Sequence, residues 1–423
     1  MKTKKQPKNI IVFVHKIPEG TIEIIRKYQK KNKVAYRIAL LTDLKKNTQQ
    51  KKDVDLYLSC ETSSETEIQK MLLPIQDQIL AITARGESSI PLFSKIIPHI
   101  PYLRTPSPSS LKWATEKISM RRRFSVYDKK INPQYILVKN LEKNTFQKIE
   151  TRIGYPAIIK PTGLAESKLV TIVYHREELE KALRRVFRSL KNVYKKSEGR
   201  WEPKVLVEQF MEGEMYSLDG QVTSRGKIYF CPPVHIKTGR SIGFDDFFGY
   251  AQMTPTNLKP SSIRSCEAVA TKAVYALGLR STSFHIELMK METGWKVIEL
   301  GPRVGGFRQE LYSLSYGINP TINDIKIRIP EKISIPKKIL GYSIAMKFFA
   351  KKEGILTNII GIKKAQTLTS FQRIIIHKKL GDRCKYAKNG GSSVFNIILF
   401  NKNRSKLLAD VRRLEQTIKI ETK

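Results

Sequence analysis

Apolar runs and amphipathic segments alternate over residues 1–100 of the chain. Ile22, Ile25 and Tyr28 recur at helical spacing, and residues 65–78 show a similar helical pattern. The apolar runs that we interpret as strands are Asn9–His15, Tyr36–Thr42, Asp55–Cys60 and Ile79–Thr83. Strands that alternate with helices predict a parallel α/β sheet. No GxGxxG motif follows the first run, so the sequence does not support a dinucleotide site of that kind.

The pattern changes after the Pro- and Ser-rich cluster Thr105–Ser110. Further strands are expected at Tyr135–Lys139, Ala157–Lys160, Val205–Gln209, Ile228–Pro232, Phe284–Met289, Trp295–Leu300, Ile339–Phe349, Phe371–His377 and Val394–Phe400. Helices are expected at Trp113–Tyr127, Glu177–Leu190, Ser262–Leu277 and Arg404–Gln416. We therefore predict an α/β (α+β) fold with a Rossmann-like domain at residues 1–112, a central domain at 113–330 and a small, basic α+β domain at 331–423.

The strongest compositional signal is positive charge, with 77 Lys and Arg against 38 Asp and Glu and a net charge of +39. Such a balance is typical of proteins that bind nucleic acids or acidic surfaces. The excess is spread along the chain, because residues 1–134 carry 26 basic and 12 acidic residues and residues 331–423 carry 21 and 6. We therefore interpret the charge mainly as a solvated basic surface, with a nucleic-acid site as the alternative.

No segment approaches the roughly 20 apolar residues that a membrane-spanning helix needs. The apolar part of the lysine-rich start, Ile10–Val14, is shorter than the roughly 7 to 15 residues of a signal-peptide core. Four cysteines, at positions 60, 231, 266 and 384, are too widely spaced for a CxxC pair. We expect a soluble, cytoplasmic protein with no membrane partner. Its oligomeric state stays open, with a homodimer as one option.

Two carboxylates lie on consecutive strand-like runs in the central segment. Glu287 belongs to FHIELMK and Glu299 to WKVIELGPRVGG, and the turn Met291–Gly294 joins the two runs. A hairpin of this length can direct both side chains from one face of the sheet. Paired hard oxygen ligands suit Mg²⁺ that bridges nucleotide phosphates, although acid pairs are also common on solvated faces.

Two upstream segments carry groups that suit a nucleotide. Lys160 ends the apolar run of YPAIIKP, where its ammonium can meet a phosphate. The run VLVEQFMEGEMYSLD then places Glu208 and Glu214 at and after the end of a strand. Such a strand end offers backbone groups to an adenine edge and a carboxylate to ribose hydroxyls.

The order of these segments resembles the ATP-grasp family, particularly its carboxylate–amine ligases. The resemblance covers residues 113–320 by motif, and the flanking segments are similar to the family's usual flanking domains, with residues 1–112 as the pre-ATP-grasp domain. It implies ATP and Mg²⁺, with Mn²⁺ as a second option, as cofactors. The implied roles are phosphate binding by Lys117 and Lys160, an adenine hinge at Glu208, Gln209 and Phe210, a ribose-side acid at Glu214, metal ligation by Glu287 and Glu299, and a catalytic arginine at Arg303.

Two positions depart from the family pattern. Gly301 stands where the family has a metal-binding asparagine, so one oxygen ligand is missing. The loop 163–168, expected to cover the phosphates, lacks a run of glycines, and Ser167 is its candidate nucleotide-binding donor.

A long segment between the hinge and the hairpin, Pro232–Gly249, has the composition of a mobile loop over the acceptor site. We expect Lys237 to contact the transferred phosphoryl group, and His235 or Asp246 to contact a substrate amine. An aromatic plug of Phe244, Phe247 and Phe248 is the alternative. His285 is interpreted as structural, on the opposite strand face from Glu287.

The implied activity is ATP-dependent formation of an amide or peptide-type bond between small-molecule carboxylate and amine substrates, through an acyl phosphate. Arg303 would stabilise the acyl phosphate, and Gly305 and Gly306 would leave room for a substrate carboxylate. The alternative is a nucleic-acid-binding or non-catalytic nucleotide-binding relative that uses its basic surface.

Overall fold

The N-terminal part of the protein is a parallel α/β sheet. The structure is a computed structural model that describes residues 7–44, 49–162, 169–196, 204–244, 246–329 and 331–423. Strands β1 (Ile10–Val14), β2 (Arg37–Asp43), β3 (Leu56–Cys60) and β4 (Ile79–Thr83) pair in the order β3–β2–β1–β4. Alternate residues of β1 face opposite layers, because Val12 packs with α2 (Glu65–Leu72) and α3 (Ile90–Ile96) whereas Phe13 packs with α1 (Thr21–Asn32) and α10 (Pro320–Lys326). The predicted parallel sheet is confirmed.

Two helices follow where the sequence pattern predicts one. The expected helix Trp113–Tyr127 is divided into α4 (Pro108–Thr115) and α5 (Lys117–Tyr127). Glu116 between them is extended, with φ −94° and ψ 107°. This break makes Lys117 the first residue of α5.

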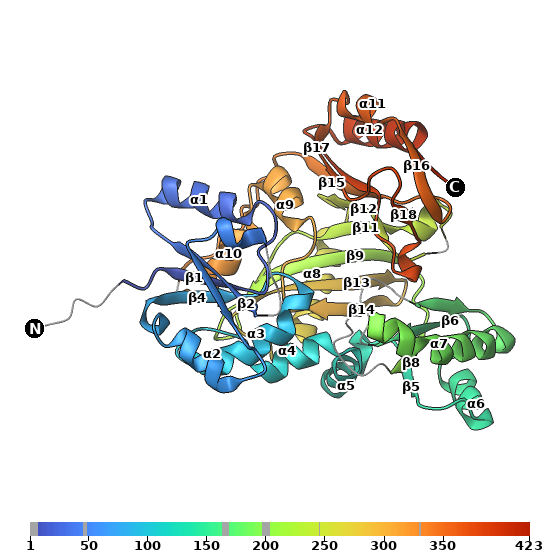
Figure 1. The fold of residues 1–423 in the computed structure, drawn as a ribbon. Helices are drawn as coiled ribbons and strands as arrows, with labels where there is room; N and C mark the ends of the chain where they lie inside the picture. Colours follow the sequence, from blue (N-terminus) through green and yellow to red (C-terminus); the bar gives the residue numbers. More distant parts are fainter. Residues whose placement is uncertain (1–6, 45–48, 163–168, 197–203, 245, 330) are drawn as a thin grey trace, which may run out of the picture.

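A small antiparallel sheet comes next, in the order β5–β8–β6–β7. Its strands are β5 (Tyr135–Val138), β6 (Ala157–Pro161), β7 (Thr171–Val173) and β8 (Val205–Gln209). Helices α6 (Lys143–Arg152) and α7 (Arg176–Lys196) contribute Ile149 and Leu183 to its core. Figure 1 shows this sheet at the lower right, away from the N-terminal sheet.

The largest element is a nine-stranded sheet in the order β14–β13–β9–β11–β12–β15–β19–β17, with β10 paired to β9. Its strands before residue 330 are β9 (Glu214–Val222), β10 (Ile228–Phe230), β11 (Val234–Thr238), β12 (Gly249–Thr254), β13 (Thr282–Met291) and β14 (Gly294–Gly301). The strands after it are β15 (Tyr342–Phe348), β17 (Phe371–Ile376) and β19 (Phe395–Asn401). The sheet therefore continues across the domain boundary that we predict at residue 330.

Helices cover this sheet on both faces. Helix α8 (Pro260–Ala276) packs on Ile286 and Leu300, whereas α9 (Arg308–Tyr316) packs on Ala345 and Ile398. In the C-terminal part, α12 (Arg404–Thr417) and α11 (Ile362–Gln366) lie beside a three-stranded sheet of β18 (Arg383–Cys384), β16 (Gly354–Ile360) and β20 (Lys419–Thr422). The predicted α/β (α+β) fold class is confirmed. No helix within the described ranges is long and apolar enough to cross a membrane.

Candidate active site

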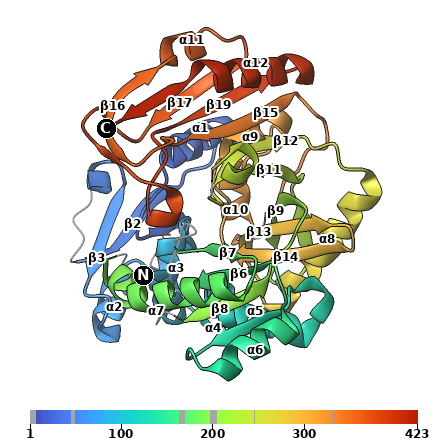
Figure 2. The ribbon, with the colours of Figure 1, turned by 90° about the vertical axis from the view of Figure 1, so that its right-hand side faces the viewer.

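A cleft of about 2070 Å³ lies where these units meet. Its walls come from the N-terminal sheet, from α5, from the small sheet and from both halves of the nine-stranded sheet. Figure 2 shows the small sheet and the C-terminal strands facing each other across this region. The volume exceeds the roughly 300–1,000 Å³ of an ordinary ligand pocket, so the cleft has room for more than one small molecule.

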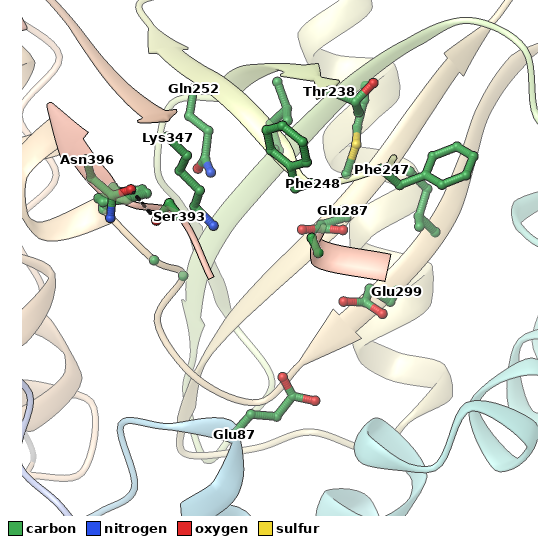
Figure 3. A pocket seen from close by; sticks show the side chains of 18 of the residues that line it. Glu87, Thr238, Phe247, Phe248, Gln252, Glu287, Glu299, Lys347, Ser393 and Asn396 are labelled. Atoms are coloured by element: carbon green, nitrogen blue, oxygen red, sulfur yellow. Dashed lines mark hydrogen bonds between the residues drawn. The ribbon is translucent and has the colours of Figure 1, made fainter. Parts of the chain in front are cut away.

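Two carboxylates project into the cleft from the β13–β14 hairpin. Glu287 and Glu299 are direct register partners, so their side chains leave the same face of the sheet (Figure 3). The side chains retain 25% and 39% of their exposure. The neighbours Ile286 and Leu300 point to the other face and pack with α8. Alternation along the two strands therefore presents the acids to the cleft.

Lys117 contacts one of these acids from the start of α5. Its Nζ lies 2.6 Å from Oε2 of Glu299. Lys117 and, more weakly, Lys160 lower the pKa of Glu299 against the opposing effects of burial and Glu87. Burial alone would lower the pKa of Lys117, but Glu299 and Glu87 raise it. Both groups are therefore charged at neutral pH, and the ammonium stands at the acid pair.

Glu208 ties the second lysine to α5. Its carboxylate, 1% exposed, accepts from Arg121 Nε at 2.6 Å and Nη2 at 3.1 Å, and from Lys160 Nζ at 2.8 Å. Burial would raise the pKa of Glu208, but Arg121 and Lys160 hold it at about 2. Arg121 also donates to the carbonyl of Ile298 at 2.7 Å. The buried carboxylate thus fixes Lys160 at the cleft wall and joins the small sheet to β14.

The predicted hinge residues lie next to Glu208. Gln209 and Phe210 line the cleft, and the Phe210 N–H donates to the carbonyl of Pro156 at 3.2 Å. Glu214, the predicted ribose-side acid, is exposed at the start of β9 and accepts from the Tyr216 hydroxyl at 3.0 Å. Gln209, Phe210 and Glu214 therefore line the same cleft as Lys117 and Lys160.

Arg240 bridges the small sheet and the turn after β11. Its guanidinium carbon lies 5.6 Å from the ring centre of Phe210 and 5.5 Å from that of Phe247. Nη2 donates to the hydroxyl of Tyr174 at 3.1 Å. We call this set of contacts the Arg240 clasp. It joins the turn after β11 to the side of the cleft formed by Phe210 and Tyr174.

Arg303 reaches the N-terminal sheet. Its Nη2 lies 3.1 Å from Oε2 of Glu87, and Glu87 raises the pKa of Arg303 against the effect of burial. Glu87 follows β4 and is directed toward the acid pair in Figure 3. The sequence interpretation missed Glu87, because only the fold brings it to Arg303, 216 residues away.

The Gly305–Gly306 segment is held by a buried carboxylate. Asp219 accepts from the Gly305 N–H at 2.8 Å, from His285 Nδ1 at 2.8 Å and from Arg308 Nε at 3.0 Å. A Cβ on Gly305 would lie 2.4 Å from His285 Nδ1, whereas one on Gly306 would meet nothing within 4 Å. The Gly305 N–H is therefore engaged within the protein, and Gly306 borders open space in the cleft.

His285 corrects one sequence interpretation. We placed it on the face opposite Glu287, but residues two apart in a strand share a face. His285 Nε2 accordingly lies 3.5 Å from Glu287 Oε1. Through its other nitrogen His285 connects this acid to Asp219.

The Pro232–Gly249 segment contributes both ionisable and aromatic side chains. Lys237 is exposed on β11 and lines the cleft, and His235 does so beside Tyr216. Asp246 is instead 2% exposed and is absent from the cleft wall, so the expected contact with a substrate amine is wrong for this residue. Phe248 packs on Phe244 and on Phe349 of the C-terminal part. Ser167 lies outside the described residues.

Residues 153–310 match the family model of the ATP-grasp domain. This segment is an ATP-grasp domain. It contains Lys160, the hinge, the acid pair and Arg303, which the sequence resemblance rests on.

Several proteins are similar over longer stretches. An uncharacterised protein of Sinorhizobium fredii, y4rH, is 25% identical over 308 residues, which are 72% of this chain and 60% of that protein. The alanine–anticapsin ligase of Bacillus amyloliquefaciens is 28% identical over 57% of this chain and 52% of the ligase. The chain thus spans about half of the length of the curated relatives it matches.

Solved structures share the fold over nearly the whole chain. An L-amino acid ligase from Bacillus licheniformis superposes with a TM-score of 0.75 at 15% identity, with full coverage of both chains. An N5-carboxyaminoimidazole ribonucleotide synthetase from Thermotoga maritima superposes with a TM-score of 0.69 at 15% identity, over 98% of this chain and 100% of the synthetase. At this identity the likeness establishes the fold of the chain.

The acid pair of the ATP-grasp domain suits a hard cation. Carboxylate oxygens are the ligands that Mg²⁺ prefers, and it usually keeps several waters and bonds to phosphate oxygens. Within the described residues no group of three or more His, Cys, Asp or Glu side chains is arranged to hold a metal. Glu287 and Glu299 therefore fit an ion whose remaining ligands come from nucleotide and water, and Gly301 adds no side-chain oxygen.

Proposed function

We propose that the protein is an ATP-dependent carboxylate–amine ligase that forms an amide or peptide-type bond and releases ADP and phosphate. The observation that carries this proposal is the convergence of Lys117, Lys160, Glu287, Glu299 and Arg303 on one cleft. The ATP-grasp domain and the curated ligases among the similar proteins support the same reaction class.

The proposed reaction has two steps. A substrate carboxylate oxygen attacks the γ-phosphorus of ATP, the bond to the bridging oxygen breaks, and ADP leaves. An amine nitrogen then attacks the acyl carbon, the bond to the phosphate oxygen breaks, and the nitrogen loses a proton. Activation is needed because a free carboxylate is a poor electrophile.

The chain's own residues supply position and charge. Lys160, fixed by Glu208, and Lys117, at the start of α5, would hold phosphate oxygens in line for transfer. Arg303 would stabilise the acyl phosphate and the tetrahedral oxyanion. Glu287 and Glu299 would hold Mg²⁺ or Mn²⁺, which when bound offsets the charge on the phosphates. The Lys117 ammonium would then leave Glu299 and contact a phosphate oxygen instead.

The other groups complete the proposed site. The backbone of Gln209 and Phe210 would meet the adenine edge, and Glu214 the ribose hydroxyls. Gly306 would border the substrate carboxylate. Lys237 receives no role at the phosphoryl group, because its neighbour Ile236 shares the sheet face of Glu287 and Lys237 therefore leaves β11 on the opposite face. We place this enzyme in the cytoplasm, where ATP is available.

The test is Glu299→Gln, assayed by ADP and phosphate release with pairs of amino acids that include alanine. We expect turnover to fall by about 100-fold or more, because removal of one preorganised charge commonly costs about this much. Circular dichroism and ADP binding should show that the variant folds. Glu292→Gln, in the exposed turn of the same hairpin, is the matched control. Unchanged turnover in Glu299→Gln, or none across the panel in the wild type, contradicts the proposal.

A further inference from the structure

Lys117 contacts one of the two acids that would hold the metal. Its Nζ lies 2.6 Å from Oε2 of Glu299, and no other cationic side chain in the described ranges lies within ion-pair distance of this carboxylate. Burial opposes the charge of Lys117, but Glu299 and Glu87 raise its pKa, so the ammonium is charged at neutral pH. Because like charges repel, an ammonium at this oxygen disfavours a divalent cation at the same oxygen.

Glu287 has a different neighbour. It is the register partner of Glu299, and its Oε1 lies 3.5 Å from Nε2 of His285. Asp219 holds the other ring nitrogen of His285 at 2.8 Å. By contrast, Glu299 is the one hydrogen-bond acceptor of the Lys117 ammonium in the part of the chain that the structure describes. Of the two groups beside the acid pair, the ammonium is therefore the one that can move to a ligand without breaking a second contact.

The other charged groups around the acid pair are paired with each other. Arg303 Nη2 lies 3.1 Å from Oε2 of Glu87, which stands across from the acid pair in Figure 3. Lys160 Nζ lies 2.8 Å from Oε2 of Glu208. Neither Arg303 nor Lys160 is therefore in position to replace Lys117 at Glu299.

The electrostatics of Glu299 agree with this arrangement. Lys117 has the largest influence on the pKa of Glu299 and lowers it, whereas burial and Glu87 oppose this effect and Lys160 adds to it. Loss of the Lys117 charge would leave Glu299 between Glu287 and Glu87 without a cation in contact. A group of like charges of this kind attracts a cation.

A nucleotide phosphate would offer Lys117 another acceptor in the same cleft. Phosphate oxygens accept strong, charge-assisted hydrogen bonds from an ammonium. The flexible four-carbon stem of a lysine lets the ammonium move while the backbone of Lys117 stays at the start of α5. The same phosphate would supply oxygen ligands to a metal ion. Binding of a nucleotide would thus free Glu299 and complete the ligands of the metal together.

We propose that Lys117 is an internal counter-cation, which keeps a divalent metal ion from the acid pair until a nucleotide phosphate binds the ammonium in place of Glu299. This inference rests on the proposed function, because it concerns the regulation of the same site. Metal alone would bind weakly, and metal and nucleotide would bind as a coupled pair. Lys117 would thus act before the nucleotide arrives as well as after it.

The experiment measures Mn²⁺ binding to the full chain by electron paramagnetic resonance, in which the free ion gives a distinct signal. Without nucleotide, Lys117→Met should bind Mn²⁺ about 10-fold or more tightly than the wild type, as expected when a charged hydrogen-bonding competitor is removed. Lys117→Gln, which keeps a donor but loses the charge, is a second variant and should also bind Mn²⁺ more tightly. Affinities in both variants that do not exceed that of the wild type overturn the proposal.

Two controls locate the gain in affinity. Glu299→Gln added to Lys117→Met should abolish the gain, because the carboxylate that Lys117 contacts is then neutral. Lys130→Met, at an exposed lysine that follows α5 and lies outside the cleft wall, removes the same charge and should bind Mn²⁺ as the wild type does. A gain that survives Glu299→Gln, or that appears equally in Lys130→Met, also overturns the proposal.

Nucleotide binding gives a second measure of the exchange. In the wild type ADP should increase the affinity for Mn²⁺, and Mn²⁺ should increase the affinity for ADP by the same factor. In Lys117→Met this factor should be smaller by about 10-fold or more, because Glu299 is accessible before ADP binds. Calorimetric titration of ADP with and without Mn²⁺ measures it. The same factor in both proteins contradicts the exchange.

ADP release from ATP in the presence of amino acids separates the two proposals. A gain in Mn²⁺ affinity in Lys117→Met, without ADP release by the wild type across the panel, would contradict the ligase reaction and leave the counter-cation standing. ADP release by the wild type, without a gain in Mn²⁺ affinity in Lys117→Met, would do the reverse.

Discussion

Glu208 shows at the residue scale how one buried carboxylate can organise a site. The sequence placed it at the hinge, where a carboxylate at a strand end suggested contact with a nucleotide. In the structure its side chain is used internally, since Arg121 and Lys160 occupy both oxygens. Only the backbone of this position is left for a ligand. The carboxylate therefore acts by positioning Lys160.

Replacement of this carboxylate gives a prediction for stability. Glu208→Gln removes the buried negative charge that neutralises Arg121 and Lys160, so we expect the free energy of unfolding at pH 7 to fall by about 3–5 kcal/mol. Urea unfolding followed by fluorescence measures this change. Glu212→Gln, at an exposed acid four residues further on, should change stability by less than about 0.5 kcal/mol.

The same pair of proteins should show a characteristic pH dependence. The pKa of Glu208 is lowered from 4.5 to about 2 in the folded protein. Its contribution is therefore complete above about pH 4.5 and disappears as the pH falls through about 2. The difference between wild type and Glu208→Gln should shrink over that interval. A difference that is constant from pH 7 to pH 2 would contradict this assignment.

Sequence order identified many of the residues of the cleft and few of their partners. Lys117, Lys160, Glu287, Glu299 and Arg303 occupy motif positions that local pattern can detect. Arg121 contacts Glu208 across 87 residues of chain, Glu87 contacts Arg303 across 216, and Asp219 contacts His285 across 66. Such pairs follow from tertiary packing, which residue type and spacing do not specify.

At the scale of elements, two local irregularities shape the cleft. The extended Glu116 interrupts the predicted helix and sets Lys117 at the start of α5, near Glu299. Glycine and proline are absent there, so the sequence offers no signal for the break. The turn η6 (Gly239–Ile242) carries Arg240 to Phe210 and Tyr174. Both irregularities connect the small sheet or α5 to the central sheet.

The Arg240 clasp predicts an effect on nucleotide binding. Arg240→Ala removes the cation–π contact with Phe210 and the hydrogen bond with Tyr174 that hold the hinge side against the turn after β11. We expect ADP to bind about 3- to 10-fold more weakly, because the two walls must then be ordered by the ligand itself. Fluorescence titration with ADP and Mg²⁺ measures this change.

The control for the clasp is Arg225→Ala, at an exposed turn between β9 and β10. Its ADP affinity should equal that of the wild type. Tighter ADP binding by Arg240→Ala would mean that the clasp opposes nucleotide entry, contrary to this prediction.

At the scale of the whole molecule, the net charge of +39 is distributed around a cleft whose wall carries both signs. Acidic and basic side chains alternate there, among them Glu19 and Arg373, whose oxygen and nitrogen are 2.6 Å apart. That pair links the loop before α1 to β17, as Glu87 and Arg303 link the N-terminal sheet to the ATP-grasp domain. The excess of positive charge therefore lies mainly on the outer surface and less on the wall of the cleft.

This distribution predicts nonspecific, salt-sensitive binding to nucleic acids. In filter binding or anisotropy, affinity for RNA or duplex DNA should fall steeply with the logarithm of salt concentration and vanish near 0.15 M, where the Debye length is about 8 Å. ADP release should be unaffected by added nucleic acid. Tight binding that persists at this salt concentration would instead favour a nucleic-acid role.

The pairing of β12 with β15 has a consequence for how such a chain can be changed. Truncation near residue 330 would leave β12 as a bare edge with unpaired backbone groups, a template for aggregation. The C-terminal segment therefore cannot simply be deleted. It can be exchanged for another segment that supplies an equivalent strand, and such recombination would replace Lys347 and Asn396 while Glu287 and Glu299 stay in place. One wall of the cleft would in this way change while the acid pair is kept.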